Sequence, residues 1–304
     1  MSELIKRVIV GVIGIPIGLA LIYVGGIVFT IALSVISSIA LWEYYHLFTT
    51  KNYHPYRIFG IVLNNIFIFG FYLIHSQSKF GYDFFLFLFF ILCTLIVLLT
   101  IGIISKRANS LINFAATLSG LIYVTFTFLT LNFIREFNLF YEWIQGNFFE
   151  VYSGIGQVGI FKNIDSDWAA KLTIIMISSI WISDSFAYFI GIKFGKHKIL
   201  TSVSPKKSWE GFIGGLAGAL SGFTFLGYYF LPDVPFVHLF IMGLIVAVFG
   251  QLGDFAESKL KRDSGIKDSS SILPGHGGIL DRFDSLMFIS PIIFIYLILN
   301  VFLK

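Results

Sequence analysis

Apolar stretches of about 20 residues recur along this 304-residue chain, and each is long enough to cross a bilayer as an α-helix. Hydrophobic residues make up 57% of the sequence and charged residues only 12%. That is well below the roughly 25% charged residues of a soluble domain. The pattern therefore predicts an all-α polytopic membrane protein.

Nine candidate spans can be placed, at residues 8–24, 27–48, 57–75, 83–104, 110–134, 171–194, 208–231, 236–253 and 285–303. The chain then divides into N-terminal helices (1–107), a middle helix with a long extracytoplasmic segment (108–170), and a C-terminal transmembrane domain expected to be catalytic (171–304). A cleaved signal peptide is the alternative for the first span. It is disfavoured because the apolar run is long and no small-residue cleavage site follows it.

The distribution of charge predicts how these spans are oriented. If the N-terminus is cytoplasmic, 16 of the 21 Lys and Arg residues fall in or beside cytoplasmic segments. This excess follows the positive-inside rule and predicts an extracytoplasmic C-terminus. The longest outer segment, 135–170, contains no catalytic constellation and is interpreted as a structural interfacial helix or hairpin.

Two bulk properties exclude other classes of partner and site. The net charge of +4 is too small to indicate nucleic acid, so membrane lipids and small molecules are the expected partners. The single cysteine, Cys93, lies inside an apolar run. Neither a disulfide framework nor a cysteine-based metal site can be built from it.

The longest charged run extends from Ser258 to Asp284, SKLKRDSGIKDSSSILPGHGGILDRFD, and precedes the last span. It holds four of the 17 acidic and five of the 21 basic residues. Charges packed this densely against a membrane are costly unless they bind something charged. We interpret the run as a site for a metal ion and the phosphates of a nucleotide. The alternative is a cytoplasmic loop with local salt bridges, which would need neither three turn glycines nor the Asp-Arg-Phe-Asp ending.

Four carboxylates are expected near the cytoplasmic ends of the helices: Asp184, Asp254, Asp281 and Asp284. Asp184 lies within the sixth span, where a charge needs a hydrated cavity or a cation; a protonated, hydrogen-bonded side chain is the alternative. Mg²⁺ is usually held by one or two carboxylates together with substrate phosphates. The pattern therefore predicts a magnesium site. Glu43, near the end of the second span, either faces a polar cavity or extends to the interface.

Basic and small residues of the charged run are suited to phosphate oxygens, since glycines let backbone N–H groups approach closely. The residues concerned are Lys259, Lys261, Arg262, Lys267, Arg282, Gly275, Gly277 and Gly278. His276 could donate to a phosphate or aid proton transfer, or it could be a structural turn residue.

The loop before the seventh span has a similar composition, with hydroxyls and lysines at Ser202, Ser204, Lys206, Lys207 and Ser208. These side chains suit phosphate oxygens, although a Lys-Lys pair often marks only a cytoplasmic flank. The span itself carries small residues at four-residue intervals, Gly214, Gly218 and Gly222. This stripe predicts the close approach of another helix.

The run S-x-L-K-R-x4-K-D-x-S-x2-L-P-G-H-G-G-I-x-D-R-F-D resembles the signature of the CDP-diacylglycerol synthases, or phosphatidate cytidylyltransferases. DSFAYFIGIKFGK (184–196) and SPKKSWEG (204–211) are also similar to that family and occur in its order. The resemblance covers about residues 171–304 by motif and the N-terminal spans only by hydropathy. Segment 135–170 has no confident match.

The resemblance implies a homodimeric membrane enzyme that condenses CTP with phosphatidic acid, giving CDP-diacylglycerol and pyrophosphate. It implies Mg²⁺, with Mn²⁺ as an alternative and K⁺ as a second cation, and a bacterial inner-membrane location with the site facing the cytoplasm. Carried over, the metal ligands would be Asp184, Asp254, Asp281 and Asp284, the last three also being catalytic with Lys267 and His276. The substrate-binding residues would be Ser202, Ser204, Lys206, Lys207, Lys259, Arg262, Asp268, Gly277, Gly278 and Arg282.

Two other functions fit parts of the sequence. A CTP-dependent lipid kinase, of the polyprenol or phytol type, would transfer the γ-phosphate, whereas the complete loop motif favours nucleotidyl transfer. A transporter could also contain a buried aspartate and glycine-rich helices. The single carboxylate within the spans and the lack of an evident inverted repeat disfavour it.

Overall fold

The computed structural model of the protein describes residues 3–75, 81–105, 108–144, 164–199 and 203–302. Within these ranges the chain forms helices joined by turns and loops, without a strand. Two isolated antiparallel bridges, Lys198 with Ser208 and Leu273 with Gly277, close the two loops that carry the sequence motifs. The predicted all-α fold is confirmed.

Each predicted span coincides with a helix. The first four are α1 (Glu3–Val24), α2 (Gly26–Thr49), α3 (Arg57–His75) and α4 (Gly81–Ile104). The fifth joins α5 (Ser110–Gly120), a π-helical turn η1 (Leu121–Thr125) and α6 (Phe126–Arg135), and the short α7 (Phe137–Ile144) follows. The last four are α8 (Ser166–Phe194), α9 (Trp209–Phe230), α10 (Phe236–Asp263) and α12 (Leu286–Phe302), with the four-residue α11 (Leu280–Phe283) before α12.

Five helical segments of the described chain are long and apolar enough to cross a membrane, namely α2, α5 to α6 taken together, α8, α9 and α10. Shorter apolar stretches lie in α1, α3, α4 and α12, at Val10–Val24, Arg57–Gly70, Ile91–Ile104 and Leu286–Val301. The protein therefore has the helices of an integral membrane protein. The number of crossings stays a prediction.

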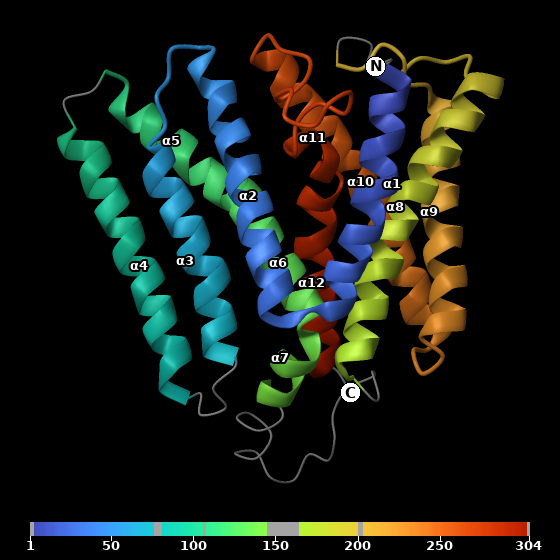
Figure 1. Ribbon diagram of the computed structural model, residues 1–304, viewed down its shortest axis with the longest axis horizontal. Coiled ribbons are helices and arrows are strands. Elements are labelled where there is room, and N and C mark those ends of the chain that lie inside the picture. The colour runs from blue at the N-terminus through green and yellow to red at the C-terminus, as the bar shows by residue number, and fades with distance from the viewer. Residues whose placement is uncertain (1–2, 76–80, 106–107, 145–163, 200–202, 303–304) are drawn as a thin grey trace.

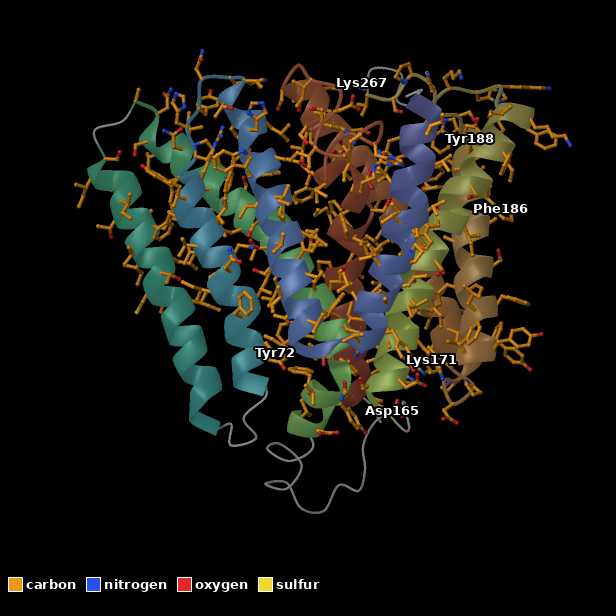
Figure 2. The ribbon with its side chains drawn as sticks, in the orientation of Figure 1. Tyr72, Asp165, Lys171, Phe186, Tyr188 and Lys267 are labelled. Atoms are coloured by element: carbon orange, nitrogen blue, oxygen red, sulfur yellow. The ribbon has the colours of Figure 1, made fainter. Side chains whose placement is uncertain are left out.

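Figure 1 shows the helices side by side, with α3 and α4 on one flank, α8 and α9 on the other, and α12 near the centre. The N-terminus and the loop leading into α11 lie at one end of this bundle, and the C-terminus and α7 lie at the opposite end. Lys267 is at the first end, and Asp165 and Lys171 are at the second (Figure 2). The charged loop and the N-terminus thus share one end.

The glycine stripe of α9 packs against α8. A Cβ added to Gly214 would lie 2.6 Å from Ile190, and one added to Gly218 would lie 2.8 Å from Phe186. Such distances are too short for any side chain larger than hydrogen. The predicted close approach of a second helix is confirmed, and it fixes α8, which carries Asp184, against its neighbour.

Arg135 and Glu136 hold the turn between α1 and α2 at the end opposite the charged loop. The Arg135 guanidinium is buried and donates to the carbonyls of Ile22 and Tyr23, the latter at 2.9 Å. The backbone N–H of Gly26 donates to Glu136 Oε1 at 2.6 Å. These contacts satisfy helix-terminal groups that would otherwise be unpaired in the protein interior. These two residues of segment 135–170 therefore have structural contacts, while residues 145–163 lie outside the described chain.

Candidate active site

The charged end of α10 organises the candidate site. This helix continues past the apolar span to Asp263, so that Asp254, Glu257, Ser258 and Lys261 share one face through their helical spacing. Ser258 Oγ lies 3.4 Å from Asp254 Oδ1, and Lys261 Nζ lies 2.6 Å from Glu257 Oε2. The continued helix therefore places these four polar side chains together on one face.

The loop after α10 folds back in a tight turn that only glycine allows at two positions. Gly275 and Gly277 have φ values of +76° and +81°, in the left-handed region that disfavours side chains. The turn closes through Leu273 N donating to Gly277 O at 2.9 Å. A Cβ on Gly277 would lie 2.6 Å from Asp281 Oδ2. The glycine pattern therefore has a packing cause, independent of any phosphate.

Asp281, at the start of α11, already has hydrogen-bond donors at both carboxylate oxygens. Lys261 Nζ lies 2.6 Å from Oδ1, and Oδ2 accepts from Gly278 N at 2.7 Å, Ser269 N at 3.0 Å and Ser269 Oγ at 3.1 Å. Burial by itself would raise the pKa of Asp281, but hydrogen bonds from its neighbours and the Lys261 charge outweigh burial and lower it. Asp281 is thus an ionised carboxylate that ties the loop to α10. This geometry favours a positioning role for it over that of a metal ligand.

Glu43 of α2 is the residue that sequence reasoning placed least well. Its side chain is only 1% exposed, and its oxygens accept hydrogen bonds from Ser269, Ser270, Ile279 and Leu280. The alternative in which this carboxylate extends to the interface is wrong. No local signal identifies these partners, because they lie more than 220 positions away along the chain.

Asp184, Asp254 and Asp284 all line one cavity of about 710 Å³. Burial, together with the neighbouring charges of Asp254 and Asp184, raises the pKa of Asp284 to about 7. Asp254 forms an ion pair with Lys207 from the loop before α9. The structure thus brings all four predicted carboxylates to one cavity, although the oxygens of Asp281 are already hydrogen-bonded to Lys261, Gly278 and Ser269. In the described part of the chain, however, no three His, Cys, Asp or Glu side chains are already close enough to hold a metal ion.

The same cavity is polar at one end and apolar over the rest of its length. Lys261, Asp268, His276, Asp281 and Arg282 join the three aspartates at the polar end. The apolar part is formed by α1, α2, α6 and α8, including Gly14 and Gly18 of α1, where an added Cβ would meet nothing within 4 Å. The cavity can therefore accept a molecule with a charged head and an apolar body.

A second cavity, also of about 710 Å³, adjoins the polar end of the first. Its walls are the charged loop itself, and four residues border both cavities: Asp268, Leu273, His276 and Arg282. Lys267 and Arg282 are exposed there, and neither forms an ion pair with a described residue. His276 Nδ1 is buried and has no hydrogen-bond partner in the described structure. The second cavity therefore has two cationic side chains without ion pairs and one buried histidine nitrogen without a hydrogen-bond partner among the described residues.

Other predicted site residues lie away from both cavities. Arg262 donates to the carbonyls of Val203 and Ile266, at 3.3 and 3.0 Å, and so ties two loops together. Lys259 forms an exposed ion pair with Asp263 at 2.7 Å. Ser204 and Lys206 belong to the loop before α9 and line neither cavity, and Ser202 lies outside the described residues. Gly278 packs against Ser269 and Glu43, whereas Gly277 borders the second cavity.

The fold and the site together define the class of protein as an integral membrane protein. At one end of its helical bundle, carboxylates and cations without ion pairs face two cavities that share lining residues. Residues 5–300 match the profile of the Cytidylyltransferase family, and the chain belongs to this family.

Relatives agree with the family match, one of them over nearly the whole chain. The chain is 33% identical over 304 residues to the phosphatidate cytidylyltransferase of Bacillus subtilis (strain 168), covering 99% of this chain and 100% of that protein. It is 42% identical over 147 residues to the phosphatidate cytidylyltransferase of Staphylococcus saprophyticus, covering 48% of this chain and 56% of the relative. It is also 41% identical over 144 residues to the enzyme of that name from Thermotoga maritima, covering 45% and 53%.

Proposed function

We propose that this protein is a phosphatidate cytidylyltransferase, which joins CTP and phosphatidic acid to give CDP-diacylglycerol and pyrophosphate. The observation that carries the proposal is the meeting of an amphipathic cavity with a cationic one at Asp268, His276 and Arg282. Phosphatidate needs a space for acyl chains beside a polar end, and CTP needs cations for its phosphates. Full-length similarity to the Bacillus subtilis enzyme supports the same assignment.

The reaction needs little from the protein beyond placement and charge. A phosphate oxygen of phosphatidate forms a bond to the α-phosphorus of CTP, the bond from that phosphorus to the β-phosphate bridging oxygen breaks, and pyrophosphate leaves with its electron pair. The nucleophile is already anionic, so no serine–histidine relay is required. Lys267 and Arg282 would hold the triphosphate against the cavity junction and offset the repulsion between two anions.

A divalent cation fits the carboxylates of the first cavity. Mg²⁺ prefers hard oxygen ligands and takes much of its shell from substrate phosphates and water. Asp184, Asp254 and Asp284, which line the same cavity, would hold it together with phosphate oxygens of the nucleotide. When bound, Mg²⁺ would neutralise charge on the phosphates. Mn²⁺ as a substitute and K⁺ as a second ion are expectations of the family resemblance alone.

The proposal includes a topology. If the four shorter apolar stretches cross the membrane as well as the five long spans, there would be nine crossings, with the two termini on opposite sides of a bacterial inner membrane. The positive-inside rule would place the N-terminus and both cavities on the cytoplasmic side, where CTP is available. A homodimer is proposed from the family resemblance.

The test is turnover by the purified protein in detergent with phosphatidate, Mg²⁺ and labelled CTP. Label from the α-phosphate should appear in the lipid product. Label from the γ-phosphate in lipid would contradict the proposal and indicate a lipid kinase. No consumption of CTP would also contradict it, and would favour a transporter, since detergent leaves no compartments to transport between.

A further inference from the structure

Glu43 joins the N-terminal half of the chain to the charged loop. Its Oε1 accepts from Ser270 Oγ at 2.5 Å and from Ile279 N at 3.1 Å. Its Oε2 accepts from Leu280 N at 2.8 Å and from Ser269 Oγ at 3.0 Å. All four donors belong to the loop and to the first turn of α11.

This carboxylate is buried without a cationic partner among the described side chains. A buried ionised group is costly unless it is well hydrogen-bonded, and hydrogen bonds to an ionised acceptor are stronger than neutral ones. Ser270 Oγ, Ile279 N and Leu280 N each donate such a bond to Glu43, while Ser269 Oγ has one proton to share between Glu43 and Asp281. These bonds are a strong local constraint on the segment that donates them. The constraint acts on backbone N–H groups as well as on hydroxyls, so it fixes the course of the main chain.

Ser269 carries the constraint to the site. Its Oγ lies 3.0 Å from Glu43 Oε2 and 3.1 Å from Asp281 Oδ2, and its backbone N–H also donates to Asp281. Lys261 of α10 holds the other oxygen of Asp281. Ser269 therefore links the loop directly to Glu43 of α2 and, through Asp281 and Lys261, to α10.

Gly278 gives an independent indication that the loop is shaped around Glu43. A Cβ at this position would collide with Ser269 Oγ and would lie 2.5 Å from Glu43 Oε2. Its φ is not in the left-handed region, so backbone conformation does not require glycine there. The close approach of Ser269 Oγ and of the Glu43 carboxylate, which are hydrogen-bonded to each other, is what excludes a side chain.

We propose that Glu43 is a positioning residue, which fixes the charged loop and α11 so that Arg282 borders both cavities and Asp284 borders the first. Glu43 lines neither cavity and touches no reacting atom. The proposal rests on the proposed function, because its consequence is the placement of groups that bind the nucleotide and its cation. It predicts that α2, which carries none of the sequence motifs, controls activity.

The test compares Glu43→Gln with Glu136→Gln. Both carboxylates are buried and both accept from backbone N–H groups, but Glu136 lies at the far end of the bundle. Glutamine replaces one oxygen by an NH₂ group, which cannot accept from the donors that face it. Glu43→Gln should lower kcat about tenfold or more, where each factor of ten corresponds to about 1.4 kcal/mol of barrier. The KM for CTP should change less than kcat, and Glu43→Asp, which keeps both oxygens, should recover part of the loss.

Two further measurements do not depend on turnover. Hydrogen–deuterium exchange should rise in residues 264–285 of Glu43→Gln, and the thermal shift produced by Mg²⁺ with CTP should shrink. Neither should change in Glu136→Gln. If Glu43→Gln does not fold, Glu43→Asp takes its place in these measurements.

Wild-type kcat in Glu43→Gln would overturn the proposal, whether or not loop exchange rises, since the contact would then be structural only. An equal loss in Glu136→Gln would also overturn it. If the wild-type protein forms no liponucleotide, the proposed function fails. Exchange and the Mg²⁺–CTP thermal shift would then decide on Glu43 separately.

Discussion

Lys261 Nζ lies 2.6 Å from Asp281 Oδ1 and also 2.6 Å from Glu257 Oε2, so one buried ammonium is shared between two buried carboxylates. The relationship separates the aspartates of the motif into two kinds. Both aspartates border the first cavity, but Asp281 has donors at both oxygens, from Lys261, Gly278 and Ser269. Asp284, three residues later, accepts from Ser285 N at its Oδ1 alone, at 2.6 Å, among the hydrogen bonds of the described residues. Asp284 therefore keeps Oδ2 for an incoming cation.

Lys261→Met should lower the free energy of unfolding by about 3–5 kcal/mol, because removing one partner of a buried ionic group leaves the others uncompensated. Denaturant titration in detergent measures this loss. The matched control is Lys259→Met on the same helix, which removes an exposed ion pair of the same i, i+4 spacing with Asp263. That change should cost no more than about 1 kcal/mol. Equal losses would mean that burial does not set the strength of these pairs.

Asp284→Asn and Asp281→Asn should differ in their effects on Mg²⁺ dependence and on stability. Asp284→Asn removes a proposed ligand and should raise the Mg²⁺ concentration for half-maximal turnover by roughly tenfold or more, the scale already seen for the partners of metal ligands. Asp281→Asn should lower stability and kcat while leaving that Mg²⁺ concentration close to the wild-type value. Mg²⁺ titrations of turnover, paired with unfolding curves, distinguish the two. A similar Mg²⁺ shift in both variants would make Asp281 a ligand.

Mg²⁺ binding should depend on pH near neutrality. Burial and the neighbouring Asp254 raise the pKa of Asp284 to about 7, so below this pH a proton competes with the ion. Without metal, the folded state binds more protons than the unfolded state between about pH 4 and 7, so stability falls as pH rises through that window. Mg²⁺ should therefore raise the melting temperature more at pH 8 than at pH 6. Asp284→Asn should remove most of this difference, and a pH-independent shift in the wild-type protein would contradict the assignment.

Lys267→Ala and Arg282→Ala should weaken the binding of CTP, because their charges line the second cavity and neither forms an ion pair with a described residue. Loss of one charge-assisted contact of about 1.5–3 kcal/mol should raise the KM for CTP by roughly tenfold or more. Lys206→Ala is the control, since Lys206 is exposed but borders neither cavity. Steady-state kinetics at saturating phosphatidate measure the effect. An equal rise in Lys206→Ala would indicate a diffuse electrostatic effect instead of a defined pocket.

Much of the fold could be predicted because its signals are local. An apolar run long enough to cross a bilayer forms a helix wherever it falls, and four-residue glycine spacing marks a close packing face, as Gly214 and Gly218 do against α8. The shared face of Asp254, Glu257 and Lys261 also follows from helical periodicity alone.

The parts that could not be predicted depend on contacts distant in sequence. The loop sequence resembles a set of phosphate ligands, but Asp281, Gly278 and Ser269 are engaged with one another and with Glu43 of α2. Whether a carboxylate binds a metal or holds a loop depends on which donors the rest of the chain brings to it. Arg262 illustrates the same limit, because its guanidinium is used by the carbonyls of two loops.

The length of acyl chain that the enzyme accepts should be controlled by α1. Gly14 borders the apolar part of the first cavity, and an added Cβ there meets no atom within 4 Å. Gly14→Phe should therefore fill the groove without displacing a neighbouring helix, and leucine or phenylalanine also forms helix more readily than glycine. Turnover should fall for long-chain phosphatidate and be retained for short-chain phosphatidate. Competition between the two lipids in mixed micelles measures the change in kcat/KM ratio.

Val12→Phe is the matched control on the same helix. Val12 is 67% exposed and does not border the cavity, so its enlargement adds apolar surface without reducing the groove. A shift in chain-length preference in both variants would point to an altered contact between α1 and the micelle. No shift in Gly14→Phe would mean that the acyl chains lie elsewhere. A shift in Gly14→Phe alone would place them in the apolar part of the first cavity, which α1 borders.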